Sequence, residues 1–152
     1  MDEITTAVIH IKQLYTENLR QLKVYKKIQN NGLVNFDSQL ALLKNQKESF
    51  CKILKNELKK LEDLGVKVLI HENKLPKFLK KKLKSNNQNL VLIALTHLER
   101  SLYSEYKCSL SVLNPKSNLY DVLLAQKNTL ENSTEILENS KNEIVEKSKA
   151  VA

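Results

Sequence analysis

Four long stretches of the sequence carry apolar residues at spacings of three, four or seven, which is the stripe of an amphipathic helix. They cover residues 3–29, 38–64, 87–113 and 118–147. The stripes include Ile4, Val8, Ile11, Leu22, Tyr25, then Leu40, Leu43, Phe50, Leu54, Leu58, then Val91, Leu95, Leu98, Leu102, Val112, and last Leu119, Leu123, Leu130, Leu137, Ile144. With only 2 Gly and 2 Pro, the chain has few residues that interrupt a helix. We therefore expect an all-α fold.

The connections between these stretches predict how the helices are ordered in space. Residues 29–37 and 114–117 are short and favour antiparallel neighbours, whereas residues 66–86 are far too many for a hairpin turn. This long segment contains VKVLIHEN, expected to be extended, and then a short helix at about residues 75–84. At about 3.3 Å per extended residue and about 1.5 Å per helical one, it can span the ~40 Å of a long helix. We expect residues 1–152 to form a single four-helix bundle with one long crossover between the second and third long helices, the ferritin-like arrangement.

Each long helix also contains one stretch that carries a family resemblance. The stretches are LKVYKKI, SFCKILKNEL, ALTHLERSLYSEY and LLAQKNTLENSTEIL. Through them, over about residues 4–140, the chain resembles an uncharacterised bacterial family of ferritin-like four-helix-bundle proteins. The resemblance implies a bundle fold and a part in stress responses.

The ligands of the usual di-iron centre of such bundles are missing from the sequence. That centre takes a Glu from two helices and a Glu-x-x-His pair from each of the other two, and the sequence has no Glu-x-x-His. His97 and Glu99 stand in the reverse order and two residues apart, so they point to different sides of their helix. Ser133 or Thr134 occupies the place where the resemblance would put a histidine in the fourth long helix. We predict no metal ligands and no cofactor, with His97 solvated or salt-bridged.

The sequence also lacks the motifs of common catalytic sites. It has no GxSxG, no P-loop and no GxGxxG, and 2 Gly are too few for a loop that cradles phosphates. Cys51 and Cys108 fall on or beside apolar stripes, which favours a packing role for both. We expect no catalytic residues and a protein that is not an enzyme.

Four polar residues interrupt the apolar stripes and predict a polar layer inside the bundle. They are Asn18, Lys47, Glu105 and Gln126. Folding the chain about its two short connections brings Glu105 level with Gln126 and Asn18 near Lys47, and the crossover places all of them in one layer. In this interpretation the Lys47 ammonium neutralises the Glu105 carboxylate near the middle of the bundle. The layer then fixes helix register, or it forms a small-ligand or degenerate metal pocket.

Much of the net charge of +8 lies in the crossover, where residues 66–84 carry seven Lys and one Glu. The lysines expected on the polar face of the short helix are Lys77, Lys80, Lys81 and Lys84, and Lys74 lies just before the helix. Its expected apolar face consists of Leu75, Phe78, Leu79 and Leu83. Such a helix acts either as a lid with a solvated face or as a binding surface for nucleic acid, an anionic membrane surface or an acidic partner. Residues 74–84 are thus the candidate polyanion-binding segment.

Together these features favour a non-catalytic helical bundle that acts as a binding or structural module. The alternatives are an unconventional metal or small-ligand site in the core and electrostatic nucleic-acid binding through the crossover. The longest apolar run, Leu90–Leu95, is far short of the roughly 20 residues of a membrane span. The N-terminal sequence lacks the order of a signal peptide, so we expect a cytoplasmic protein. The partner and the state of self-association, including a homo-oligomer, remain open.

Overall fold

The computed structural model describes residues 2–30, 37–69 and 74–151. Within these ranges the chain is all-helical, with five helices and no strand. The helices are α1 (Glu3–Asn30), α2 (Asp37–Asp63), α3 (Lys77–Leu83), α4 (Gln88–Val112) and α5 (Asn118–Val151). Their bounds lie close to those expected, except that α5 continues beyond its expected end at residue 147. Residues 66–69 are not helical, as expected, and the rest of VKVLIHEN lies outside the described ranges.

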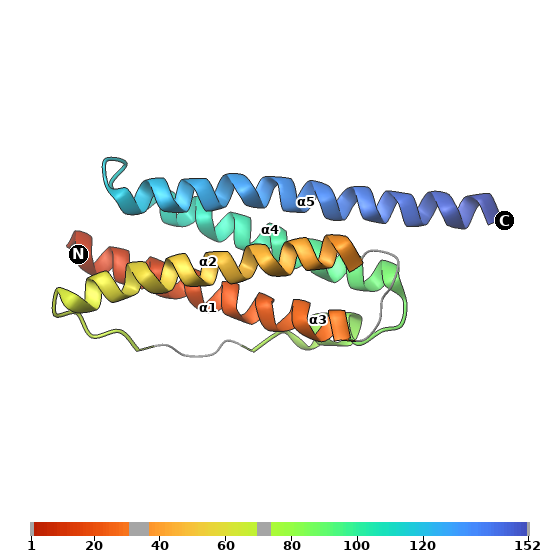
Figure 1. Cartoon of the computed structure of the whole chain (residues 1–152), viewed down its shortest axis with the longest axis horizontal. Helices are drawn as coiled ribbons and strands as arrows, with labels where there is room; N and C mark the ends of the chain where they lie inside the picture. Colours follow the sequence, from red (N-terminus) through yellow and green to blue (C-terminus); the bar gives the residue numbers. More distant parts are fainter. Residues whose placement is uncertain (1, 31–36, 70–73, 152) are drawn as a thin grey trace.

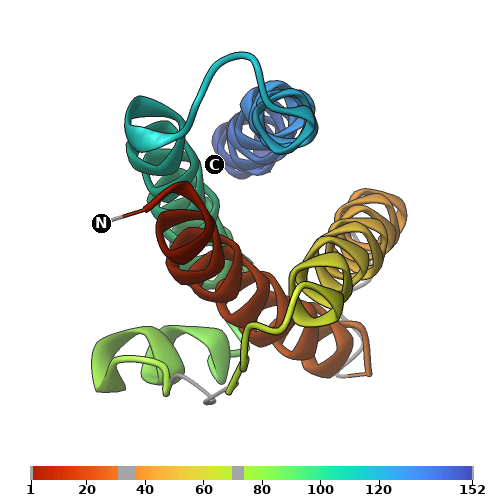
Figure 2. The ribbon, with the colours of Figure 1, turned by 90° about the vertical axis from the view of Figure 1, so that its left-hand side faces the viewer.

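The four long helices lie along the long axis of the molecule (Figure 1). Helices α1 and α5 run in one direction along this axis, and α2 and α4 run in the opposite direction. Helix α1 packs mainly on α2, and α4 packs mainly on α5, while smaller contacts join α1 to α4 and α2 to α5. The short helix α3 packs on α4, at the periphery of the long helices in the end-on view (Figure 2). The connection from α2 to α4 therefore lets these two helices run parallel.

Polar side chains fix the starts of the last two helices. The side-chain oxygen of Asn87 accepts a hydrogen bond from the N–H of Asn89 at 3.0 Å, at the start of α4. The hydroxyl of Ser117 accepts one from the N–H of Tyr120 at 3.2 Å, at the start of α5. These bonds satisfy N–H groups that the first turn of a helix leaves without a partner. Ser117 therefore caps α5.

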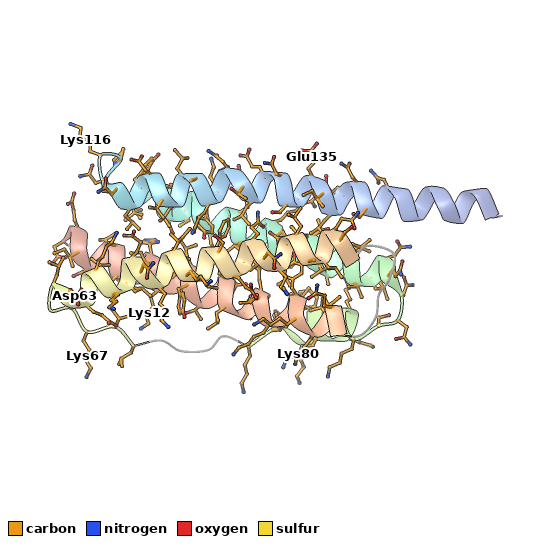
Figure 3. All side chains as sticks on the ribbon, in the orientation of Figure 1. Lys12, Asp63, Lys67, Lys80, Lys116 and Glu135 are labelled. Carbon is orange, nitrogen blue, oxygen red and sulfur yellow. The ribbon has the colours of Figure 1, made fainter. Side chains whose placement is uncertain are left out.

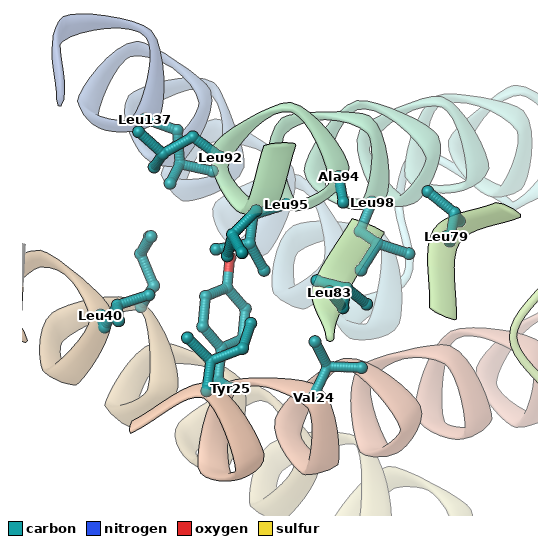
Figure 4. Packing of buried hydrophobic residues seen from close by; sticks show 13 residues of the cluster. Val24, Tyr25, Leu40, Leu79, Leu83, Leu92, Ala94, Leu95, Leu98 and Leu137 are labelled. Atoms are coloured by element: carbon teal, nitrogen blue, oxygen red, sulfur yellow. The ribbon is translucent and has the colours of Figure 1, made fainter. Parts of the chain in front are cut away.

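Two clusters of buried apolar side chains fill the interior. One includes Tyr25, Leu95 and Leu98 and extends to α3 (Figure 4). The other includes Leu54 and Leu102, from the middle of α2 and α4. Because each cluster takes only one face of each helix, the opposite faces are free to be polar. Among the described residues, no helix combines the length and the apolar character that crossing a membrane requires.

Helix α3 buries a narrower face than the sequence predicted. Leu79 and Leu83 are buried and Leu75 is partly buried, but Phe78 is 54% exposed. The Phe78 ring instead meets the ring of His97 on α4 edge-on, with centroids 6.0 Å apart. A helix of 7 residues has about two turns, so only one line of side chains reaches the core.

Gly65 follows the end of α2 and adopts a left-handed backbone conformation. Its φ is +88°, and the N–H of Val66 donates to the carbonyl of Leu61 at 3.4 Å. Since a Cβ at this position would meet no atom within 4 Å, a substitution costs backbone strain alone. Gly65→Ala should lower the free energy of unfolding by about 1–2 kcal/mol, measured by urea denaturation.

Gly65→Asn is the matched control, because asparagine tolerates the left-handed region better than alanine does. We expect it to lose less stability than Gly65→Ala. Equal losses of unfolding free energy in the two variants would show that backbone strain at position 65 is not the cause of the destabilisation.

Candidate functional site

A buried ion pair lies near the midpoints of α2 and α4. The ammonium nitrogen of Lys47 lies 2.8 Å from Oε2 of Glu99, and both side chains are 0% exposed. The hydroxyl of Tyr25, on α1, donates a hydrogen bond to Oε1 of Glu99 at 2.6 Å. Both oxygens of the Glu99 carboxylate are therefore bonded, and the three side chains join α1, α2 and α4.

The charges in this cluster balance each other. Burial lowers the pKa of Lys47, and the Glu99 carboxylate opposes this by stabilising the ammonium. Burial and the same carboxylate raise the pKa of Tyr25 well above its usual value, so the phenol keeps its proton and donates. The Lys47 nitrogen also lies 5.7 Å from the centre of the Phe50 ring, a cation–π distance. The Lys47 ammonium is thus the counter-ion of Glu99.

A second polar cluster joins α1, α4 and α5. The amide of Asn18 donates to the hydroxyl of Tyr106 at 3.1 Å, and that hydroxyl donates to Oε1 of Gln126. Burial raises the pKa of Tyr106, so the phenol remains a donor. The ring of Tyr106 meets Phe50 edge-on at 6.3 Å, and Phe50 also contacts Lys47, so the two clusters adjoin.

Three of the four residues predicted for the polar layer are buried, and one is not. Asn18, Lys47 and Gln126 lie in the interior, but Glu105 is exposed. The prediction that Glu105 is the core partner of Lys47 is therefore wrong, and Glu99 takes that place. Tyr25 and Tyr106 were not predicted as members of the layer, because a tyrosine on an apolar stripe resembles an ordinary core residue.

The rotation of α4 about its own axis explains the exchange of Glu105 for Glu99. Three helical residues turn through about 300°, so these two glutamates lie about 60° from Leu102 on opposite sides. The helix turns the Glu99 side inward, together with Leu95 and Tyr106, which are both 0% exposed. The pattern of leucines alone does not decide which flank faces the core. A signal was present in Tyr106, which lies on the same side of Leu102 as Glu99.

Glu105 lies instead near an ion pair on α1. Partial desolvation and the nearby Glu17 carboxylate raise the pKa of Glu105 to about 7. Glu17 is itself buried and bonded to the Arg20 guanidinium at 2.6 Å, and this arginine opposes the rise. Glu105 is thus a titrating group close to neutral pH.

The histidines and cysteines of the described part of the chain do not come together. No group of three or more His, Cys, Asp or Glu there could hold a metal ion. His97 is exposed. Cys51 is buried, and burial raises the pKa of its thiol to about 11, so it stays protonated at neutral pH. Cys108 is exposed rather than packed, because it lies one residue before the buried position Ser109.

The five lysines predicted for the basic patch are all exposed. Lys74, Lys80 and Lys84 line a groove between α1 and α3, whereas Lys77 and Lys81 are not among its lining residues. Figure 3 shows Lys80 projecting from the same side of the molecule as Lys67. The lysines therefore fall into a groove-lining set and an outward pair.

Comparisons with models of known protein families, with curated proteins and with solved structures found no match. The ferritin-like resemblance therefore stays a prediction.

Lys47→Met should leave the Glu99 carboxylate buried without a counter-ion. We expect the free energy of unfolding to fall by about 3–5 kcal/mol, measured by urea denaturation. Lys47→Met combined with Glu99→Leu should recover much of this loss, because removing both charges removes the unpaired one. The double-mutant cycle separates this coupling from packing effects.

Two controls sharpen the test of the ion pair. Lys55→Met changes an exposed lysine of the same helix and should alter stability by less than about 0.5 kcal/mol. Combining Lys47→Met with Glu105→Leu should recover nothing, since Glu105 lies outside the core. Recovery with Glu105→Leu in place of Glu99→Leu would show that the pairing described here is wrong.

The raised pKa of Glu105 predicts a pH dependence of stability. Its folded value of about 7 exceeds the ordinary value of 4.5, so between these pH values the folded chain binds more protons than the unfolded chain. The stabilising contribution of protonated Glu105 is complete below pH 4.5 and is lost as the pH rises to about 7. The stability of the wild type relative to Glu105→Gln should therefore fall over this range in urea denaturation, by a modest amount because the residue is exposed. A difference that stays constant or grows would contradict it.

Proposed function

We propose that the chain is a non-catalytic four-helix bundle of ferritin-like topology that works as a binding or structural module. In this proposal the Lys47 ammonium takes the place that metal ions occupy in di-iron bundles. The observation that carries the proposal is the fully buried pair of Lys47 and Glu99, 2.8 Å apart, with Tyr25 on the second carboxylate oxygen.

The helix directions support the ferritin-like topology. An up-down-up-down bundle has its second and third long helices antiparallel, whereas one long crossover makes them parallel. Helices α2 and α4 run in the same direction, and α3 lies in the connection between them (Figure 1). A role in stress responses is part of the proposal only through the resemblance, since no described residue bears on it.

The chemistry of Glu99 supports a core that is closed to metal. Its two oxygens already accept bonds from Lys47 and Tyr25. A divalent cation would have to displace the Lys47 ammonium, which would then remain buried beside a like charge without its partner. Unlike a metal ion, the ammonium is covalently attached and cannot dissociate. A built-in cation therefore serves to position helices.

The reactive groups of the core support a binding role over a catalytic one. The Lys47 nitrogen belongs to a side chain that is 0% exposed, so a substrate has no access to it. The buried Cys51 remains a thiol at neutral pH and is a poor nucleophile. Exposed cations, in contrast, are concentrated on α3 and the adjoining part of the chain. Ligand binding through this surface is the activity that best fits these residues.

The proposal predicts how the protein responds to metals. A ligand that binds the folded state and not the unfolded state stabilises the fold by RT ln(1 + [L]/Kd), which raises the melting temperature. Adding Zn²⁺, Mn²⁺ or Fe²⁺ should leave the melting temperature unchanged, and elemental analysis of the purified protein should give well below one equivalent of metal.

Two glutamate variants test the alternative that the core binds a metal ion. Stoichiometric metal that is lost in Glu99→Gln and kept in Glu105→Gln would overturn the proposal in favour of a metal site in the core. Metal lost equally in both variants would also overturn it, with a site that involves the surface near Glu105.

A further inference from the structure

A groove of about 400 Å³ lies between α1 and α3. Six basic side chains are among its lining residues: Arg20, Lys23 and Lys27 of α1, Lys74 before α3, and Lys80 and Lys84 in or at the end of α3. Among the described residues that line it, none is acidic. Cations thus lie on both walls, and their potentials add in the space between them.

The floor of this groove is aliphatic. It is formed by Val24, Ile28, Leu75 and Leu83. Val24 and Ile28 are only 6% and 2% exposed, because they belong to the apolar cluster beneath the groove. None of the described lining residues is aromatic, so a nucleobase would find no ring on which to stack. The groove therefore combines cationic walls with aliphatic carbon at its base.

Arg20 is held in a fixed position in this groove. One of its terminal nitrogens donates to the carbonyl of Lys74 at 2.9 Å, and the other donates to the Glu17 carboxylate at 2.6 Å. Its Nε–H is buried and has no acceptor among the described residues. Arg20 thus holds the segment before α3 against α1.

We infer that this groove binds a small amphiphilic phosphate, meaning one or two phosphate groups on a short aliphatic chain. The phosphate oxygens would accept charge-assisted bonds from the basic side chains of both walls. The aliphatic chain would cover the floor and remove apolar surface from water. The volume also suits such a ligand, since small-molecule sites hold roughly 300–1,000 Å³. This site rests on the binding role in the proposed function and names its class of ligand. It does not depend on the metal question, because it shares no residue with the pair of Lys47 and Glu99.

The same lysines could instead attract a nucleic acid or an anionic bilayer, and these alternatives make a different prediction. Extended polyanions interact with all exposed cations of a basic surface, so the outward Lys77 and Lys81 would contribute as much as the groove-lining Lys80 and Lys84. A ligand inside the groove depends on the groove-lining pair alone. The aliphatic floor has no role in phosphate-backbone binding, so it favours the amphiphile.

The experiment compares two lysine pairs with the same spacing, Lys77 with Lys81 inside α3 and Lys80 with Lys84, the residue that caps α3. Octyl phosphate is titrated by calorimetry into the full chain, at concentrations where it is monomeric, with inorganic phosphate and octanol as head-only and tail-only probes. Octyl phosphate should bind at one equivalent and at least about tenfold more tightly than either probe. Lys80→Gln with Lys84→Gln should weaken it at least about tenfold, while Lys77→Gln with Lys81→Gln should change it by less than about twofold.

A substitution in the aliphatic floor of the groove provides an independent test. Leu75→Ser should reduce the affinity for octyl phosphate but leave that for inorganic phosphate unchanged, with circular dichroism to confirm the fold. If this variant does not fold, the comparison of the two exposed lysine pairs decides alone. Octyl phosphate that binds no more tightly than inorganic phosphate would overturn the inference, as would equal losses in the two pairs. Binding only to single-stranded nucleic acid or to phosphatidylglycerol vesicles would overturn it as well.

Discussion

The buried pair of Lys47 and Glu99 is the constraint on which the arrangement of the long helices depends. Removing two charges from water costs several kcal/mol per ion, and only close contact offsets this cost. The 2.8 Å separation requires one rotation and one axial offset of α2 relative to α4, and Tyr25 extends the requirement to α1. Apolar side chains tolerate a small slip, whereas a slipped ion pair leaves a buried charge unpaired. We interpret the pair as a device for a unique arrangement more than for net stability.

The rotation that this pair imposes on α4 determines what the other polar residues of the helix do. Glu105 is turned outward to the neighbourhood of Glu17. His97 precedes Glu99 by two residues and therefore points about 200° away from it around the helix. That direction brings the His97 ring to Phe78 on α3. One buried contact thus helps to decide how the peripheral helix packs on the bundle.

The sequence predicted the helices well because burial repeats with the period of the helix, and their bounds follow from where that repeat begins and ends. It predicted that Lys47 needs a carboxylate inside the bundle but named Glu105, since the choice between Glu99 and Glu105 depends on a rotation that only contacts between helices decide. The tyrosine hydroxyls were missed for a related reason, because hydrogen bonding distinguishes Tyr25 from a leucine only when its partner is known. The lysines were correctly placed at the surface, but the groove requires α1, whose position relative to α3 no local pattern encodes.

Charges are paired in the core, whereas the described lining of the groove carries cations only. Inside the bundle the Lys47 ammonium faces a carboxylate, whereas the described lining of the groove brings six cations together with no acid among them. Like charges at this density repel, so the position of α3 has to be maintained by other contacts. Leu79 and Leu83 supply them by entering the same apolar cluster as Val24. Apolar burial here holds cations close together against their repulsion, so the local electrostatic energy is less favourable than it could be. Such locally unfavourable arrangements are expected where a protein binds its ligand.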